Sequence, residues 1–389
     1  MKTFLTFLFL SICCLYAKPE VIKLNIEFSS WTNNYMWPVL ASGGIHIDEE
    51  AIYIPDQKSL YIQSRKNHMD KAIVEINVPG DDYFRIQKVL PTKTSYYFSF
   101  IAGDGRLYLY KRALSKNEYL GPISKHGNMG RILELPNGNI LVGGEYRPNY
   151  ANYLDLYDDE TRGGPTELAI TKFGQFYENQ KAFTLTYYDK SLVVLDSANI
   201  IQRIGDNARM FSSLFVRHTM DVSGDGTVWL IDNDQGYFVE KYSVDNKPLV
   251  GFKINNPKFK PIAETMTTEI NETYQETSNA YTQAYALYLK NKHVLTSFMS
   301  ASADRGVPVP PYYYDICNLD GKHITSGQLD YPIICEDEQD KVFLLVRKDA
   351  GWFDDDELYL YGITLEDLLN GKANREFVAR AISKYESSR

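Results

Sequence analysis

One stretch of the sequence has the residue types and spacing of a calcium-binding loop. In "DVSGDGTVWLID" (residues 221–232), oxygen-bearing side chains alternate along the chain and a carboxylate occupies the twelfth position. Such a loop curls its oxygen ligands around one ion. Here, however, Trp229 stands at the ninth ligand position, and the alternation of "TVWLI" is typical of a strand, which spreads side chains along a ladder. We therefore predict a β-hairpin with a Gly-Asp-Gly turn, and we expect no metal or cofactor.

The histidines show no spacing that would build a local metal site. The sequence has six: His46, His68, His126, His218, His293 and His323. No pair has the spacing of four with an intervening Glu that places two ligands on one helix face. His46 and His218 each precede a hairpin and could line a central channel, although a structural or solvent-facing role is what we expect for both.

Acidic clusters and nucleophile motifs are the other sequence features that could support catalysis. The clusters "EDEQD" (residues 336–340) and "FDDDE" (residues 353–357) could supply the paired carboxylates of glycoside hydrolysis, and "DDDE" (residues 354–357) could hold weakly bound calcium. Consecutive acids on a turn usually point apart into water, so we expect solvated loops. The sequence has no Gly-x-Ser-x-Gly and no Ser-x-x-Lys motif. We therefore assign no catalytic, cofactor-binding or metal-binding residue from the sequence.

The N-terminal segment indicates export. Residues 1–17 combine Lys2, an apolar run and a terminal Ala17, which is typical of a secretory signal peptide. Lipid attachment at Cys13 or Cys14 is the less favoured alternative, because Ile12 stands where a small residue is required. No other apolar run approaches the roughly 20 residues of a transmembrane helix. We expect a periplasmic or extracellular protein.

The amino-acid composition further restricts the class of protein and its fold. A formal net charge of -9 argues against nucleic-acid binding, which needs clustered Lys and Arg. Thirty Tyr and nineteen Phe favour strands. Beyond the predicted signal peptide only Cys317 and Cys335 remain, and one disulfide or two buried thiols are both compatible with this pair.

A repeated pattern dominates the rest of the chain. Seven times, a polar turn rich in Gly, Asp, Asn or Lys leads into an alternating apolar strand, with units about 48 residues apart on average. The central apolar residues are Ile52, Leu107, Ile140, Leu192, Val228, Val294 and Val342. Further strands follow several of these hairpins, which gives the four-stranded unit of a β-propeller blade. We predict an all-β propeller with seven blades, or six if one unit is an insertion resembling a blade.

The predicted domain boundaries follow from this pattern. Residues 18–363 form the propeller, and the alternating segment 20–28 is expected to pair with the last blade and close the ring. Residues 263–289 form a polar insert, of the kind that maps to a binding face. Residues 364–389 form a helical segment, because Thr364 is a plausible N-cap and apolar residues recur downstream at helical spacing.

The stretches "VSGDGTVWLIDND", "NGNILVGG" and "NLDGKHI" resemble NHL-type and related bacterial extracellular propellers, which are usually six-bladed. That resemblance implies the fold, whereas the family includes both enzymes and binding modules. Aromatic residues in 29–38, 310–315 and 349–356 stand beside turn-formers and suit sugar or peptide capture, but we expect them to pack on the Tyr-rich core.

We therefore predict an exported, monomeric, non-catalytic propeller that recognises a protein or glycan ligand through loops on one face. The competing hypothesis is a metal-dependent hydrolase, lactonase-like or lyase-like, whose channel ligands come from separate blades.

Overall fold

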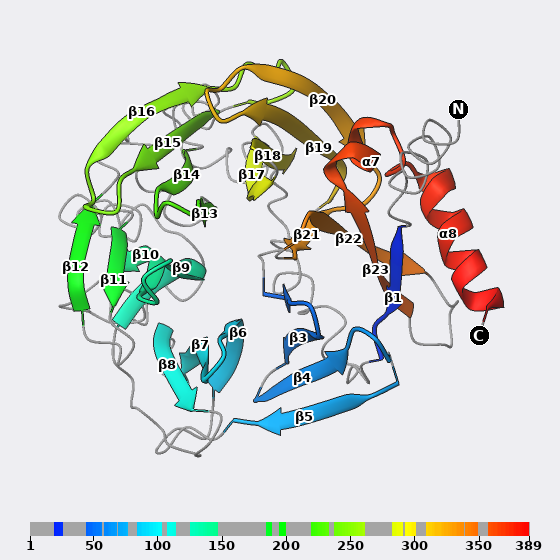
Figure 1. Cartoon of the computed structure of the whole chain (residues 1–389), viewed down its shortest axis with the longest axis horizontal. Coiled ribbons are helices and arrows are strands. Elements are labelled where there is room, and N and C mark those ends of the chain that lie inside the picture. The colour runs from blue at the N-terminus through cyan, green and yellow to red at the C-terminus, as the bar shows by residue number, and fades with distance from the viewer. Residues whose placement is uncertain are drawn as a thin grey trace, which may run out of the picture.

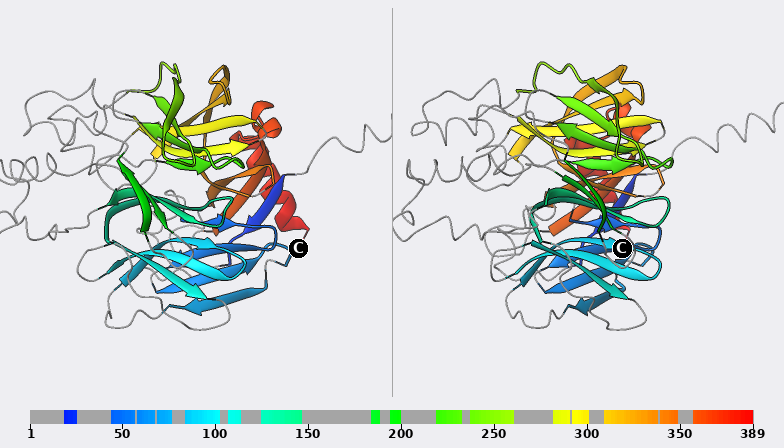
Figure 2. Two further views of the ribbon diagram at one scale, coloured as in Figure 1. Left: turned by 60° about the vertical axis from the view of Figure 1, so that its left-hand side comes forward. Right: turned by 90° about the vertical axis from the view of Figure 1, so that its left-hand side faces the viewer.

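The chain forms a ring of six β-sheet blades around one axis in a computed structural model (Figure 1). Seen from the side, the strands run across the ring from one face to the other (Figure 2). The structure describes residues 19–25, 44–56, 58–67, 69–76, 84–102, 107–113, 125–146, 184–188, 194–199, 219–232, 237–260, 282–290, 292–300, 309–337, 339–348 and 357–388.

Blades 1 to 3 occupy the N-terminal half of the chain. Blade 1 consists of β2 (His46–Ile47), β3 (Ala51–Asp56), β4 (Ser59–Ser64) and β5 (Lys71–Glu75). Blade 2 consists of β6 (Phe84–Pro91), β7 (Ser95–Ala102) and β8 (Leu107–Ala113). Blade 3 consists of β9 (Lys125–Glu134), β10 (Ile140–Tyr146), β11 (Thr184–Tyr188) and β12 (Val194–Asn199). A short pairing of β8 with β9 joins blades 2 and 3 into one seven-stranded sheet.

Blades 4 to 6 complete the ring. Blade 4 consists of β13 (Met220–Val222), β14 (Val228–Asp232), β15 (Phe238–Tyr242) and β16 (Pro248–Lys253). Blade 5 consists of β17 (Thr282–Lys290), β18 (His293–Ser300), β19 (Val309–Asn318) and β20 (His323–Leu329). Blade 6 consists of β21 (Ile333–Glu336), β22 (Lys341–Lys348), β23 (Glu357–Thr364) and β1 (Glu20–Lys23).

The propeller prediction is confirmed, with six blades and not seven. Two of the predicted hairpin units belong to a single blade: the unit around Ile140 joins β9 to β10, and the unit around Leu192 lies between β11 and β12. The count treated every strong hairpin as the start of a blade, but any two neighbouring strands of a blade can be joined by a turn of this chemistry.

The hairpin turns repeat one local geometry, which explains the sequence pattern. In blade 4, the Ser223 amide donates to the Thr227 carbonyl and the Gly226 amide to the Ser223 carbonyl, with Gly226 at a positive φ of 84°. The turn from residue 318 to residue 322 has the same two bonds, with Gly321 at 86°. This backbone conformation favours glycine. The hairpin predicted at residues 221–232 is therefore confirmed.

The ring is closed by the N-terminal strand, as the sequence predicted. β1 pairs antiparallel with β23, with Val21 opposite Tyr361. Glu20 is bound by Arg65 of blade 1 and by Lys341 of blade 6. Burial alone would raise the pKa of Glu20, but these two cations lower it to about 2. Glu20 thus ties the closing strand to both blades that flank it.

The apolar core is divided among the blade interfaces. Six clusters of buried side chains occur in the described part of the chain, one between each pair of adjacent blades. Leu344 packs toward blade 5, while its neighbour Leu345 packs toward blade 1. Because neighbouring blades cover both faces of such a strand, its sequence is a continuous run of apolar residues.

Two helices follow the last strand. α7 (Leu365–Leu369) begins at Thr364, whose side chain accepts a hydrogen bond from the Asp367 amide, as predicted. α8 (Arg375–Ser387) begins at Asn374 and lies on the outer rim beside β1 (Figure 1). Val378 and Ile382 of α8 are buried against blades 5 and 6.

Several sequence predictions meet the structure only in part. Residues 282–289 of the predicted insert form most of β17, whereas the rest of it and residues 1–17 lie outside the described residues. Cys317 and Cys335 are both free and buried. Tyr312 and Tyr314 are buried in β19, which confirms the core interpretation of that aromatic stretch. The aromatic stretches 29–38 and 349–356 lie outside the described residues.

Candidate functional site

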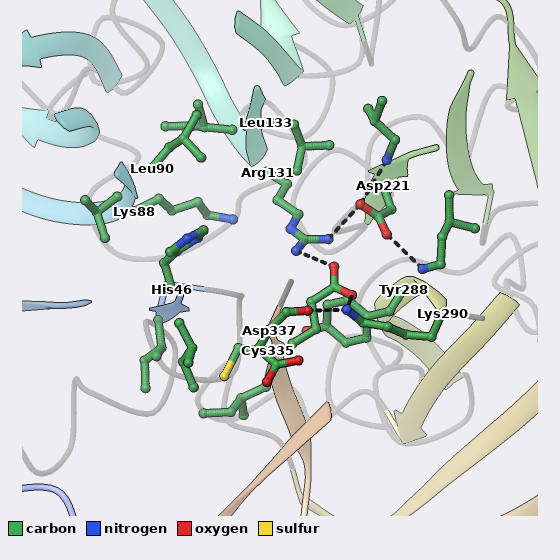
Figure 3. A pocket seen from close by; sticks show the side chains of 18 residues that line it. His46, Lys88, Leu90, Arg131, Leu133, Asp221, Tyr288, Lys290, Cys335 and Asp337 are labelled. Atoms are coloured by element: carbon green, nitrogen blue, oxygen red, sulfur yellow. Dashed lines mark hydrogen bonds and ion pairs between the residues drawn. The ribbon is translucent and has the colours of Figure 1, made fainter. Parts of the chain in front are cut away.

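A cavity of about 250 Å³ lies at the propeller axis (Figure 3). The innermost strand of every blade contributes to its wall, so the site is assembled from segments far apart in the sequence. Its ionisable side chains are His46, Lys88, Arg131, Asp221, Tyr288, Lys290, Cys335, Glu336 and Asp337. In a propeller the inner strands converge on the axis, and this convergence makes a polar residue on an inner strand part of one shared site.

Arg131 of β9 links three blades across the cavity. Its Nη2 donates to Glu336 Oε1 of β21 at 3.0 Å, and its Nη1 lies 3.5 Å from Asp221 Oδ1 of β13. The guanidinium carbon lies 5.1 Å from the centroid of the Tyr288 ring. Arg131 thereby satisfies two carboxylates with its fixed fork of donors, a role for which the guanidinium is well suited.

Lys290 and Asp337 extend this network in two directions. The Lys290 ammonium lies 3.0 Å from Glu336 Oε2 and also donates to the Asp337 carbonyl. The Asp337 carboxylate accepts from Arg65 Nη2 at 2.7 Å, outside the cavity lining. The Asp337 carboxylate therefore joins the ion pairs of Arg65 and Glu20 that close the ring, whereas the Glu336 carboxylate pairs with Arg131 and Lys290 at the axis.

Asp221 is fixed by the backbone as well as by Arg131. Its Oδ1 accepts from the Val222 amide at 2.9 Å, and its Oδ2 accepts from the Leu289 amide at 2.8 Å. Burial and the nearby Glu336 carboxylate raise its pKa to about 7, against the opposing effect of Arg131. Asp221 thus changes charge near neutral pH in the middle of the site.

His46 contributes a neutral ring. Burial, followed by the charge of Arg131, lowers its pKa to about 4. At neutral pH the imidazole therefore carries one N–H donor and one acceptor nitrogen. Its ring centroid lies 6.0 Å from that of Tyr53, whose hydroxyl donates to Asp48.

The arrangement suits the binding of a small polar group. A cavity of this size is slightly smaller than the roughly 300 Å³ at which drug-sized pockets begin. Three cations (Lys88, Arg131 and Lys290) and three carboxylates (Asp221, Glu336 and Asp337) line it, and Arg131 and Lys290 pair with Asp221 and Glu336. In the described part of the chain, no three His, Cys, Asp or Glu side chains are grouped as a metal site requires.

The structure brings four of the candidate residues into this site, namely His46, Asp221, Glu336 and Asp337. His46 and Asp221 line the cavity, whereas Asp225 stays in its turn, where it accepts from the Thr227 amide at 3.0 Å. His323 is half-exposed on the outer strand of blade 5 and lies 3.2 Å from Asp315. His218 lies outside the described residues.

The expectation of a solvated acidic loop at residues 336–340 was wrong for its first two members. The Glu336 side chain is 12% exposed and that of Asp337 only 1%. They lie at the end of an inner strand, where Arg131, Lys290 and Arg65 neutralise them. In the second cluster Glu357 pairs with Lys23 and Lys348, and residues 353–356 lie outside the described residues.

Sequence reasoning missed the basic residues of the site. Lys88, Arg131 and Lys290 each interrupt an apolar strand that begins a blade. A charged residue in such a strand is a usable signal, since a buried charge requires a partner. The signal becomes specific only when the first strand of each blade is known, and the hairpin count did not establish this.

Comparison with known proteins bears on the fold only. No protein-family model matches the sequence. No curated protein matches it either. Among solved structures, the chain is similar to the Malassezia sympodialis allergen Mala s 1 (9% identity, 89% of this chain and 96% of that chain, TM-score 0.46).

Two further solved structures share this likeness. One is the β-propeller domain of the trilobed protease from Pyrococcus furiosus, with 12% identity over 82% of this chain and 96% of that chain, and a TM-score of 0.41. The other is a luciferin-regenerating enzyme, with 9% identity over 82% of this chain and 90% of that chain, and a TM-score of 0.42. At these identities the likeness carries no information about activity.

Among the described residues, none of the helices combines the length and the apolar character that a membrane crossing needs.

Proposed function

We propose that the chain is an exported, non-catalytic β-propeller that binds a glycan by admitting one sugar unit into the axial cavity. The observation that carries this proposal is the pairing of the cavity's carboxylates. Asp221 and Glu336 are engaged by Arg131, Lys290 and backbone amides, so they are held as fixed walls of a site. A rigid, hydrogen-bonding cavity of about 250 Å³ matches a single polar ring better than a protein segment.

The proposal also includes export of the protein and a relationship to NHL-type propellers. If residues 1–17 are a signal peptide, the protein purified from its exporting host begins near Lys18. Intact-mass measurement of that protein tests this directly. A mass that includes residues 1–17 would contradict export through cleavage.

The binding proposal is tested by filling the cavity without altering its charge. Leu133 lines the cavity, and a Leu133→Trp variant should abolish binding of any glycan that titrates the wild-type protein in calorimetry. Leu249→Trp, on the exposed strand β16, is the matched control and should bind normally. Melting curves of both variants check the fold, because overpacking costs about 1–3 kcal/mol.

Two outcomes would overturn this function. One is a failure of wild-type protein to bind any member of a panel of neutral and acidic oligosaccharides. The other is saturable binding to a protein ligand that Leu133→Trp blocks, which would make the cavity a receptor for a protein side chain.

A metal-dependent propeller enzyme is the second candidate, and the Asp221 carboxyl favours it. A group with a pKa of about 7 suits acid–base chemistry near neutral pH. However, Asp221 and Glu336 already pair with Arg131 and Lys290, whose positive charges would oppose a divalent cation bound to the same carboxylates. We expect elemental analysis of the purified protein to find no stoichiometric metal and chelator to leave its melting unchanged; stoichiometric calcium or zinc would favour the enzyme.

A further inference from the structure

We propose that the outer edge of blade 4 binds an extended segment of another protein, with an apolar centre and acidic ends, as an additional strand beside β16. This edge lies on the rim of the ring, so the proposal is independent of the axial cavity and of the glycan function (Figure 1). Three features of β16 support it: an unpaired edge, two exposed apolar side chains and a lysine at each end.

The first feature is the unpaired edge. In the part of the chain that the structure describes, β16 pairs with β15 and with no other strand. The free edge of such a strand presents backbone N–H and C=O groups that can pair with an added strand. The outer edge of blade 6 differs, because α8 lies beside β1 there (Figure 1).

The second feature is a pair of apolar side chains on this strand. Val250 is 89% exposed, and its neighbour Leu249 is 45% exposed. Among the described residues, no other two consecutive large apolar side chains are exposed. Consecutive side chains of a strand point to opposite faces of the sheet. A strand added beside β16 would therefore cover apolar surface on both faces of blade 4.

The third feature is the charge at the two ends of the strand. Lys247 directly precedes β16 and Lys253 is its last residue, and both are exposed. Neither side chain forms an ion pair or a hydrogen bond with another described residue. In a protein whose net charge is -9, these two cations favour a partner with an acidic residue near each end.

The same lysines argue against a second copy of this chain as the partner. In an antiparallel pair of two β16 strands centred on Val250, Lys247 would stand opposite Lys253 of the other copy, because both lie three positions from Val250. Such a dimer would contain this contact twice, and like charges directly opposite each other destabilise a strand pair.

An anionic lipid surface fits this edge less well than an acidic peptide. Lipids do not continue the ladder of backbone hydrogen bonds, whereas an extended peptide does. The exposed carboxylates of Asp245 and Asp320 lie in turns beside β16, and the second of these turns contacts Phe252 through Gly321. These carboxylates would repel a broad anionic surface, but a single strand can place its acids at the two lysines alone.

The experiment measures the fluorescence anisotropy of labelled peptides titrated with the full chain. The acidic probe is Glu-Glu-Val-Thr-Val-Glu-Glu, and the control probe has Lys in place of every Glu. We expect the acidic probe to bind at least about tenfold more tightly than the basic one. Replacing its central Thr by Pro should abolish binding, because Pro removes a backbone donor from the added strand.

Two sets of variants locate the site. Val250→Asp should weaken binding of the acidic probe at least about tenfold, whereas Ile73→Asp, at a 54% exposed position of the outer strand of blade 1, should match the wild type. Lys247→Glu combined with Lys253→Glu should reverse the preference, so that the basic probe binds more tightly. Lys66→Glu combined with Lys93→Glu makes the same charge change at exposed positions of other blades and should keep the wild-type preference. Melting curves check that each variant folds.

Several outcomes would overturn the proposal. One is a failure of the acidic probe to bind the wild type, or equal binding of the acidic and basic probes. Loss of peptide binding in Leu133→Trp would move the peptide to the axial cavity. Binding to vesicles of phosphatidylcholine and phosphatidylglycerol that Val250→Asp abolishes, without peptide binding, would make the edge a lipid site. A dimer in sedimentation that Val250→Asp dissociates would make the partner a second copy.

Discussion

Two ion-pair clusters of this molecule have similar composition and opposite surroundings. At the axis, Arg131 and Lys290 pair with Asp221 and Glu336, whose side chains are 11% and 12% exposed. At the rim, Lys23 and Lys348 pair with Glu357 and Glu386, whose exposures are 31% and 35%. The contacts in the two clusters differ little in length, since Lys348 lies 2.6 Å from Glu386 and Arg131 lies 3.0 Å from Glu336.

The difference shows that burial, and not contact distance, decides what an ion pair does. Water and salt screen the rim cluster, so its pairs contribute little to stability. At the axis the charges have lost their hydration, and removing one partner leaves another without compensation. The axial cluster is therefore sensitive to mutation, to protonation and to a charged ligand, whereas the rim cluster serves mainly to attach α8 beside β1.

The largest effect is expected from breaking the axial cluster at its centre. Arg131→Met would leave Asp221 buried without its cation and Glu336 with Lys290 alone. We expect a loss of about 3–5 kcal/mol in the free energy of unfolding, measured in urea.

A charge-neutral version of the cluster provides the control for that measurement. Adding Asp221→Asn to Arg131→Met should restore part of the loss, because Lys290 still pairs with Glu336 and no uncompensated carboxylate remains. A double variant that is no more stable than Arg131→Met would show that the packing of Arg131 on Tyr288 matters more than its charge.

A smaller, pH-dependent effect is expected at Asp221. Its pKa rises from about 3.8 when unfolded to about 7 when folded, so the folded state binds the proton more tightly. Its contribution to stability is therefore complete below pH 4 and is lost as pH rises through 7. The Asp221→Asn variant has no carboxyl group that can titrate at this position. The melting temperature of the variant should therefore rise relative to that of the wild type between pH 5 and pH 8. Parallel curves would mean that Asp221 stays ionised throughout.

The smallest effect is expected at the rim. Lys348 has a 48% exposed side chain and pairs with Glu386 at 2.6 Å and Glu357 at 3.6 Å. Lys348→Met should cost at most about 1 kcal/mol, and that cost should shrink further in high salt. A loss as large as that of Arg131→Met would contradict the ranking by burial.

Most of the fold could be predicted from the sequence, because the hairpins of the propeller depend on local patterns of turn residues and alternating strands. Turn residues such as Gly226 and Gly321 have positive φ angles that glycine favours, so the hairpins could be read directly from the pattern. The closing strand was predictable from its alternation before the first hairpin. The blade number was not, since the strength of a hairpin signal does not tell which two strands of a blade it joins.

The site was largely invisible in the sequence for a physical reason. Lys88, Arg131 and Lys290 come from β6, β9 and β17, and only closure of the ring brings them together. No local sequence motif therefore indicates that these three side chains lie close together. For Glu336 and Asp337 the sequence predicts a solvated turn, because their neutralising cations lie far away in the chain. His46 could be placed near a channel, but its neutral state depends on burial and on Arg131.

The pairing of β1 with β23 also determines when the ring can close during synthesis of the chain. Blade 6 takes its outermost strand from residues 20–23 and its other three from residues 333–364, so ribosomes supply the first piece of this blade long before the rest. Blades 1 to 5 can assemble as they emerge, but the ring stays open until residues 333–364 have been made. A circular permutant that starts at β2 and carries β1 after β23 would make every blade from consecutive strands, and its ring could form without waiting for a distant partner.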